Sequence, residues 1–248
     1  MKTELQGLVE QLEAAPTLPP GSDERFNGYA GMGVPFMSGH ILAMRRFAVT
    51  SIGPGYTSVW HRNPAGEWFF YTTSPARQSC PRYFGVMASD FVQTDVQIKW
   101  EAANRLRILV PSIPLDWEVN MKLTLATRMM NLMAGLLPEA AWHNTTFLSA
   151  MGLMAGPMLG VGHVRLAGNV PNGQSFIANP RLIWAITDSH ATLAGEDLGL
   201  PGPVKPQAHL ADFWIPQQGL FAIGESYFET FDPSRHSAVI TGAKLVAS

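Results

Sequence analysis

The longest alternation of apolar and polar residues lies between Ile113 and Leu125. Its apolar members all occupy odd positions, and they are Ile113, Leu115, Trp117, Val119, Met121, Leu123 and Leu125. Successive side chains of a strand point to opposite faces of a sheet, so this period of two predicts an antiparallel strand over 113–125. Its polar face, with Asp116, Glu118 and Lys122, either meets solvent, which is the default, or lines the lumen of a barrel.

Shorter runs of strand character lie on both sides of this segment. Those before it are 40–49, 57–61, 67–73, 96–100 and 105–110, with a hairpin turn over Asn63 to Gly66. Those after it are 163–170, 174–178, 181–187 and 190–195, with turns at 171–173 and 179–180, and a final hairpin of 208–215 and 219–231. The chain is therefore expected to be mainly β.

Helical spacing appears in three places. Apolar residues of the first fifteen positions recur at 5, 8, 9 and 12, which predicts a short amphipathic helix that ends at Pro16. A second helix is expected over 125–137, and a weaker helix or an apolar loop over 146–159. The glycine-rich, uncharged stretch 26–44 does not follow a strand pattern, so we interpret it as a loop packed against the body rather than a dinucleotide-binding loop.

These elements predict one antiparallel β-barrel or cone, closed or half-closed. We expect an N-terminal helix and linker over 1–25, followed by a single barrel domain over 26–248 with a helical, methionine-rich insertion at about 125–160. A lipocalin-like barrel is the alternative architecture.

Composition narrows the function classes. Only 15% of the 248 residues are charged and the net charge is −2, without a basic run, so the footprint of a nucleic-acid binder is missing. The single cysteine, Cys80, excludes an internal disulfide framework and suits a reducing compartment. The N-terminus lacks an apolar signal core, and we expect a cytoplasmic protein without a membrane span.

Charged residues are rarest between Leu123 and Val164, where Arg128 and Glu139 are the only two. Seven of the twelve methionines fall between Met121 and Met158. Methionine is flexible and adapts to irregular partners, so this segment suits a lid over a hydrophobic ligand, with Met129 and Met133 in contact with it, or the interface of a homo-oligomer.

Polar residues that can carry chemistry are few. His61 follows Trp60 at the end of a strand and can act as a general acid or base, although a histidine bonded to turn backbone has the same pattern. Arg77, Arg82 and Tyr83 can hold a carboxylate and donate to an oxyanion, or belong to a surface loop. Glu118 is a further candidate for substrate binding if the polar face of its strand lines the lumen of a barrel. No metal motif is present, and no cofactor is expected.

The last third of the chain contains a family-like series of motifs. It comprises Asp197 to Pro201, Val204-Lys205, His209, Asp212, Pro216 and Tyr227. This series resembles the end of acetoacetate decarboxylase-like proteins, and the segment 77–85 resembles the part of that family that ends in Pro-Lys-Lys. The resemblance implies a β-cone around a pocket. In the family a lysine forms a Schiff base with a keto acid, but here Pro81-Arg82-Tyr83 stands at that place, and arginine cannot form the imine.

A second resemblance rests on the strand with Trp60-His61 and the aromatic strand after it, which is similar in texture to lipocalin-like hydratases and cyclases. Together these features favour an enzyme of lyase or isomerase type that acts on a small or medium apolar carbonyl or carboxylate compound without a Schiff base. Tyr83 and His61 would move protons, and Arg77, Arg82, Trp60, Glu118, Met129 and Met133 would bind the substrate. The alternative is a non-catalytic carrier of a hydrophobic ligand.

Overall fold

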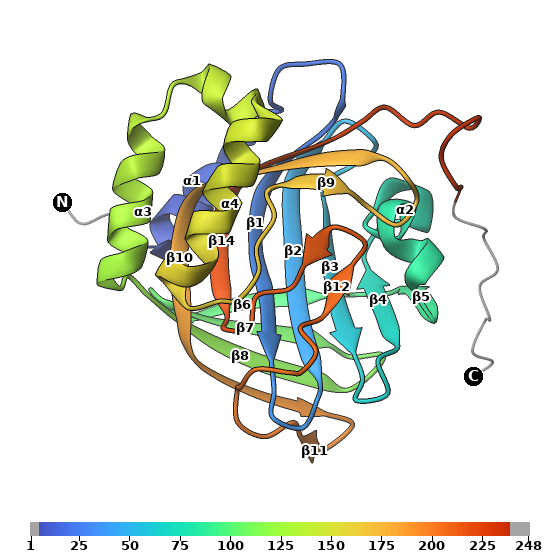
Figure 1. The fold of residues 1–248 in the computed structure, drawn as a ribbon. Helices are drawn as coiled ribbons and strands as arrows, with labels where there is room; N and C mark the ends of the chain where they lie inside the picture. The colour runs from blue at the N-terminus through green and yellow to red at the C-terminus, as the bar shows by residue number, and fades with distance from the viewer. Residues whose placement is uncertain (1–4, 239–248) are drawn as a thin grey trace.

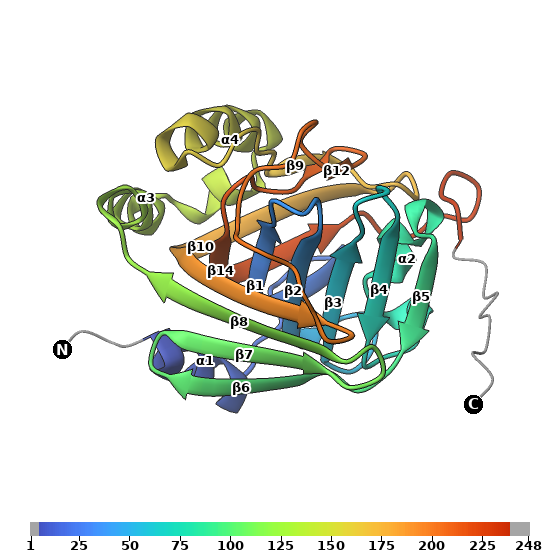
Figure 2. The ribbon, with the colours of Figure 1, turned by 90° about the horizontal axis from the view of Figure 1, so that it is seen from below.

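A curled, almost entirely antiparallel sheet forms the body of the protein in the computed structural model, which describes residues 5–238 (Figures 1 and 2). Along the sheet the strands are β5 (Asp90–Gln93), β4 (Trp68–Thr72), β3 (Tyr56–Arg62), β2 (Ile41–Thr50), β1 (Glu24–Pro35), β14 (Leu220–Phe228), β10 (Ser175–Leu193), β8 (Leu115–Lys122), β7 (Arg105–Val110) and β6 (Gln97–Ala102). Only β4 and β5 pair in parallel. No pairing joins β5 to β6 among the described residues, so the predicted barrel is half-closed.

The smaller elements lie around this sheet. Strands β9 (Ala167–Asn169) and β11 (Glu196–Asp197) pair with β10, and β12 (His209–Leu210) pairs with β13 (Phe213–Trp214). The helices are α1 (Leu5–Ala14), α2 (Pro81–Phe84), α3 (Leu125–Leu136) and α4 (Thr145–Leu159), with short 3-10 turns η1 (Ala76–Gln78), η2 (Gly85–Met87) and η3 (Glu139–His143). The predicted helices at 1–15, 125–137 and 146–159 are therefore confirmed as α1, α3 and α4.

The inside of the curl is filled by a hydrophobic core. Leu42 and Val59 of the β1–β4 side and Ile108 and Trp117 of the β7–β8 side belong to one buried cluster, which Leu5 of α1 joins. The alternation over 113–125 fits this arrangement, since the odd residues of β8 are buried and the even ones are partly exposed. Side chains therefore fill the centre of the curl.

The expected loop at 26–44 is wrong, because most of it forms β1 at the centre of the sheet, between β2 and β14. Its glycines serve close packing: a Cβ on Gly28 would lie 2.0 Å from the carbonyl oxygen of Arg46 on β2. Gly33 has a φ of +155°, in the region that favours glycine, where the register of β1 shifts. Glycine marks a bulged, closely packed strand here rather than a loop.

The separate strands expected at 174–178, 181–187 and 190–195 form one bent strand, β10, which pairs with β14 and then with β8. The predicted turn at Asn179-Pro180 is wrong, since the register shifts there as a bulge, which accommodates a proline without an N–H. The final hairpin is also wrong, because β12 and β13 pair with each other while β14 lies between β1 and β10. From residue 5 to 238, no helix is both long and apolar enough to cross a membrane.

A candidate ligand cavity on the outer face of the sheet

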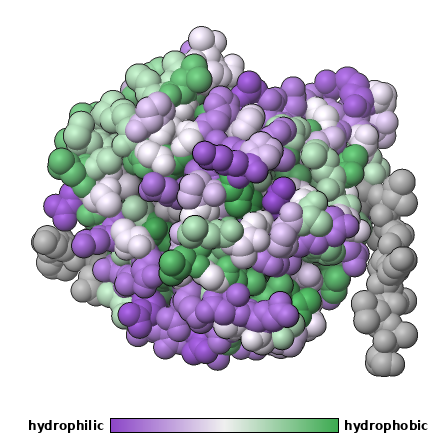
Figure 3. Space-filling model, turned by 60° about the horizontal axis from the view of Figure 1, so that its bottom comes forward, coloured by the Kyte–Doolittle hydropathy of each residue, from purple (hydrophilic) through white to green (hydrophobic). Residues whose placement is uncertain are grey.

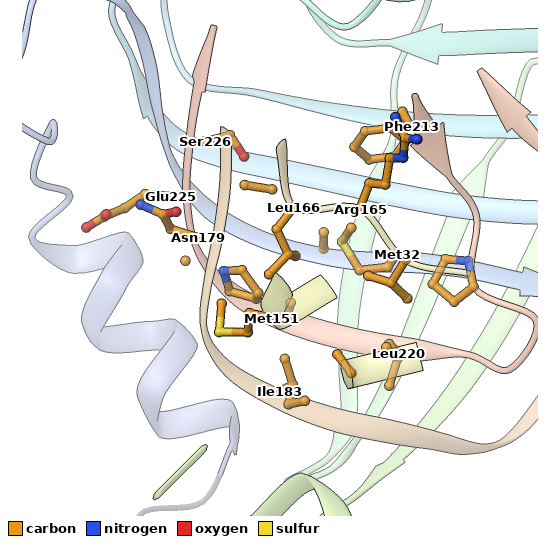
Figure 4. Close-up of a pocket in the computed structure, with 18 of the residues that line it drawn as sticks. Met32, Met151, Arg165, Leu166, Asn179, Ile183, Phe213, Leu220, Glu225 and Ser226 are labelled. Carbon is orange, nitrogen blue, oxygen red and sulfur yellow. The ribbon is translucent and has the colours of Figure 1, made fainter. Parts of the chain in front are cut away.

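A cavity of about 390 Å³ lies between the outer face of the sheet and its cover of helices and loops. Its floor is formed by β1, β2, β10 and β14, and its cover by α3, α4, the segment 164–166 and Phe213 with Trp214. We call this space the outer cavity. Figure 4 shows Asn179, Glu225 and Ser226 at one end of it, and Met32 with Phe213 at the other. Its lining is mostly aliphatic, aromatic and methionine side chains, as is typical of small-molecule sites.

Arg45 is the buried cation of the outer cavity. Its residue is only 4% exposed, and its guanidinium lies over the ring of Trp60, 4.6 Å from the ring centroid. It donates to the backbone carbonyls of Gly31 (2.8 Å), Met44 (3.0 Å) and Met32 (3.2 Å). No carboxylate of the described residues lies within 4.0 Å of it. Burial lowers the pKa of Arg45 to about 10, so the group remains charged at neutral pH.

The bulge in β1 explains why these carbonyls can accept from Arg45. The pairing of β1 with β2 shifts register between Gly31 and Val34, and the pairing with β14 shifts between Gly31 and Gly33. Within such an irregularity the ladder of backbone hydrogen bonds is interrupted, so buried carbonyls need other donors. The guanidinium supplies them. The neutral carbonyls leave its positive charge unbalanced in an apolar surrounding, which is costly and favours an anionic partner.

Two weak acids line the cavity beside Arg45. The hydroxyl of Tyr56 lies 3.4 Å from the sulfur of Cys80, and both side chains are buried. Burial raises the pKa of the Cys80 thiol, although Tyr56 and Arg45 act in the opposite direction. Burial also raises the pKa of Tyr56 well above its usual value. At neutral pH both groups therefore keep their protons and are donors rather than nucleophiles or bases.

The other end of the cavity holds a buried amide and an ion pair. Neither the nitrogen nor the oxygen of the Asn179 side chain has a hydrogen-bond partner among the described residues, although the residue is fully buried. Glu225 accepts a hydrogen bond from Arg181 at 2.8 Å and one from the hydroxyl of Tyr227 at 3.2 Å. A buried amide without a partner is uncommon in folded proteins and calls for an explanation such as a ligand or a water molecule. Asn179 is therefore a second candidate for a polar contact with a ligand in a mostly apolar lining.

Three of the residues predicted from the sequence line the outer cavity: Trp60, Tyr83 and Met133. The ring of Tyr83 faces the aromatic lining and stacks on Phe228, with 3.9 Å between the centroids, but its hydroxyl donates to Glu24. Arg82 is bound to the same carboxylate through Nε at 2.9 Å. Both polar groups are thus engaged with Glu24, which is not part of the lining.

The other predicted residues lie elsewhere. Arg77 is exposed on η1, and Met129 is exposed on α3. Glu118 lies on β8, opposite Arg107 of β7 and His190 of β10, on the partly exposed face of the strand. His61 is buried on β3 and outside the cavity lining, so the structure does not bring it together with Tyr83.

Arg45 was missed because we interpreted 40–49 only as a mostly apolar strand. Its signal was the pair Arg45-Arg46, since alternation places one of two adjacent residues on each face.

His61 forms a buried pair with His40. The Nε2 atom of His61 lies 2.9 Å from Nδ1 of His40, and the two rings are stacked. Burial, together with the proximity of His40, lowers the pKa of His61 to about 4. In the unfolded chain a histidine has a pKa of about 6.5. As the pH falls, His61 is therefore protonated at a higher pH in the unfolded chain than in the folded protein.

We predict that the free energy of unfolding is highest above pH 6.5 and falls between about pH 6.5 and 4, by up to about 3 kcal/mol from this group. Urea denaturation at several pH values measures it. His61→Gln should flatten the profile in this window. Parallel profiles for the variant and the original chain would show that His61 does not carry the effect.

Comparison with known proteins was made for sequence and for structure. No family model matches the sequence. No curated protein sequence matches it either. A crystal structure of acetoacetate decarboxylase from Legionella pneumophila is similar to this chain at 12% identity, with a TM-score of 0.41 and 90% of each chain covered. A second acetoacetate decarboxylase structure is similar at 10% identity and a TM-score of 0.40, covering 96% of this chain and 97% of its own. At identities of 10 and 12%, both similarities concern the fold alone.

Proposed function

We propose that this chain is an enzyme of lyase or isomerase type that takes a small or medium apolar compound with a carboxylate or carbonyl group into the outer cavity. One observation carries the proposal: Arg45 is charged and buried, and its hydrogen bonds go only to backbone carbonyls in the described structure. An anionic oxygen placed beside the guanidinium would gain a charge-assisted hydrogen bond and balance the buried charge. The apolar lining would bind the rest of the molecule.

The groups around Arg45 suit reactions in which negative charge develops on a carbonyl oxygen. A fixed guanidinium in an apolar cavity stabilises such an oxyanion more than water does. Tyr56 and Cys80, which keep their protons, can donate a hydrogen bond or a proton to this oxygen. Enolisation, hydration or dehydration, and cyclisation all belong to this class. An imine is not supported, because the lysines of the described part, Lys99, Lys122 and Lys205, are exposed and absent from the lining.

A carrier function is the second candidate, and one observation favours it. Glu225 is the only carboxylate in the described lining, and it is held by Arg181 and Tyr227. With its lone pairs engaged, it is poorly placed to remove a proton from a ligand. A cavity that binds an anion but lacks a free base would store or carry the ligand unchanged.

Native mass spectrometry of the freshly purified protein tests both functions. We expect the protein to retain a ligand, and Ala222→Phe, which places a ring into the cavity lining, to lose it. The extracted ligand is then incubated in excess with ligand-free protein. A change in its mass or retention time supports the enzyme, and recovery of the unchanged ligand supports the carrier. Decanoate, an apolar chain with one carboxylate, serves as a probe ligand if no ligand is retained. The outer cavity is not the site if the original chain holds no ligand and also binds no decanoate. The same conclusion follows if Ala222→Phe retains the ligand as well as the original chain does.

A further inference from the structure

The surface over α3 and α4 is apolar although it is exposed. Nine of the fourteen exposed large hydrophobic residues in the described structure belong to these two helices. Figure 3 shows hydrophobic atoms gathered at its upper left, where Figures 1 and 2 place α3 and α4, and a mostly hydrophilic lower surface. A patch of this kind on a water-soluble body is typical of an interaction surface.

Helix α3 turns its apolar face away from the body. Its exposed members recur at helical spacing, and they are Leu125, Met129, Leu132, Met133 and Leu136. Toward the sheet, the amide of Asn131 exchanges two hydrogen bonds with the backbone of Ile183 on β10, at 2.8 and 3.0 Å, and Met130 is half-buried in the lining of the outer cavity. An amphipathic helix of a water-soluble protein normally buries its apolar stripe against the core. This helix instead leaves most of its large apolar side chains exposed.

Helix α4 also exposes large apolar side chains. A Cβ on Gly152 would lie 2.8 Å from the carbonyl oxygen of Val164, so the helix backbone packs directly on the segment that follows it. Leu148 of α4 is buried against Trp142 and Leu166, but Phe147, Leu153, Met154 and Met158 are exposed. Both helices therefore leave several large apolar side chains exposed to the outside.

This surface is continuous with the mouth of the outer cavity. Met133, Phe147, Met154 and Met158 are exposed and also line the cavity. These side chains thus connect the outside of the two helices with the interior of the cavity. A second copy of the chain seated on the same surface would cover this mouth.

Charges at the edge of the surface point to the kind of partner. Lys122 and Arg128 are exposed at the start of α3, and neither forms an ion pair with the described residues. The acid of this region, Glu139, is bound by Arg181 at 2.6 Å. The edge is therefore basic. Exposed apolar side chains beside unpaired basic ones match the boundary between the acyl chains and the anionic headgroups of a bilayer.

We propose that α3 and α4 dock on the surface of a lipid bilayer that carries anionic headgroups, and that the outer cavity receives its apolar ligand from there. The docking itself stands on the exposed helices alone. The delivery of a ligand rests on the function proposed above. The side chains of Leu132 and Leu153 would enter the headgroup–acyl boundary, with Lys122 and Arg128 near the headgroup charges.

Sedimentation with vesicles tests the docking with the full-length protein. We expect cosedimentation with vesicles of phosphatidylcholine and phosphatidylserine, and weaker binding to phosphatidylcholine alone. The double variant Leu132→Glu with Leu153→Glu should bind at least about tenfold more weakly, because two charges would have to enter the apolar boundary. The matched control is Leu200→Glu, whose side chain is 73% exposed, compared with 67% for Leu132 and 64% for Leu153, but lies outside both helices. It should bind as the original chain does.

Two outcomes would overturn the docking proposal. One is the absence of binding to either vesicle. The other is a dimer in light scattering that the double variant separates into monomers, which would identify a second copy as the partner. Decanoate binding, measured calorimetrically on the same preparations, separates the two proposals. If the protein binds decanoate but not vesicles, the docking proposal fails and the proposed function of the cavity stands. If it binds vesicles but not decanoate, the docking proposal stands and the proposed function fails.

Discussion

Replacing Arg45 by methionine is expected to weaken the binding of decanoate, used as a probe ligand, by about 100-fold. The guanidinium is a buried cation in a mostly apolar lining, and its charge has no anionic partner in the described structure. A charge-assisted hydrogen bond contributes about 1.5–3 kcal/mol, and about 2.7 kcal/mol corresponds to the expected change in the dissociation constant. Methionine keeps much of the volume of the side chain and leaves the apolar contacts in place. Isothermal titration calorimetry measures the change.

The adjacent residue provides the control for this experiment. Arg46 lies on the same strand but faces the other side of the sheet, where it binds Glu13 through two hydrogen bonds of 2.8 Å. Arg46→Met should leave decanoate binding unchanged. Decanol, which has the same chain without the charge, should bind similarly to both variants. Equal losses in Arg45→Met and Arg46→Met, or equal losses for decanoate and decanol, would contradict a specific role of the Arg45 charge.

Replacing Glu24 by alanine is expected to lower the free energy of unfolding by about 3–5 kcal/mol. The carboxylate of Glu24 binds Arg82, Tyr83 and Gln174 and also accepts from the backbone N–H of Phe231 at 3.2 Å. Burial would raise its pKa, but the hydrogen bonds from Arg82 and Tyr83 outweigh this effect and lower it. In the variant, Arg82 and Tyr83 would stay largely buried without the carboxylate that binds them. An uncompensated buried charge of this kind strongly destabilises the folded state. Urea denaturation at neutral pH measures the loss.

A second ion pair of similar geometry serves as the control. Arg107 binds Asp116 through two hydrogen bonds, at 2.8 and 2.5 Å, but more than a third of each of these side chains is exposed. Solvent screens exposed pairs, so Asp116→Ala should change the unfolding free energy far less than Glu24→Ala. Similar losses in the two variants would mean that burial does not decide the contribution of Glu24.

The sequence predicted most of the sheet because local pattern reports which face of an element is buried. The alternation over 113–125 corresponds to β8, and the turn at Asn63 to Gly66 joins β3 to β4 as expected. Helices α3 and α4 were also predicted. The half-closed barrel follows from these elements, and the resemblance of the C-terminal motifs pointed to a cone fold. These features depend on neighbours along the chain.

The errors concern features that depend on distant partners. Gly28 and Gly31 were interpreted as loop residues because the carbonyl of Arg46 that excludes a side chain at position 28 comes from another strand. Pro180 was interpreted as a turn, whereas pairing with β14 makes it part of a bulge. The site shows the same limit. Tyr83 and Arg82 were placed with a ligand, but Glu24, which binds both, is almost sixty residues away in sequence. The carbonyls of Gly31 and Met32 that accept from Arg45 come from β1, another strand, at the point where it bulges.

A crystal structure of the protein with a terminally brominated decanoate locates the ligand directly, because bromine is identified by its anomalous scattering. We predict a bromine peak in the outer cavity among the side chains of α3 and α4, with the carboxylate within hydrogen-bond distance of the Arg45 guanidinium. A bromine peak inside the curl of the sheet, or a carboxylate bound away from Arg45 in the presence of saturating ligand, would contradict it.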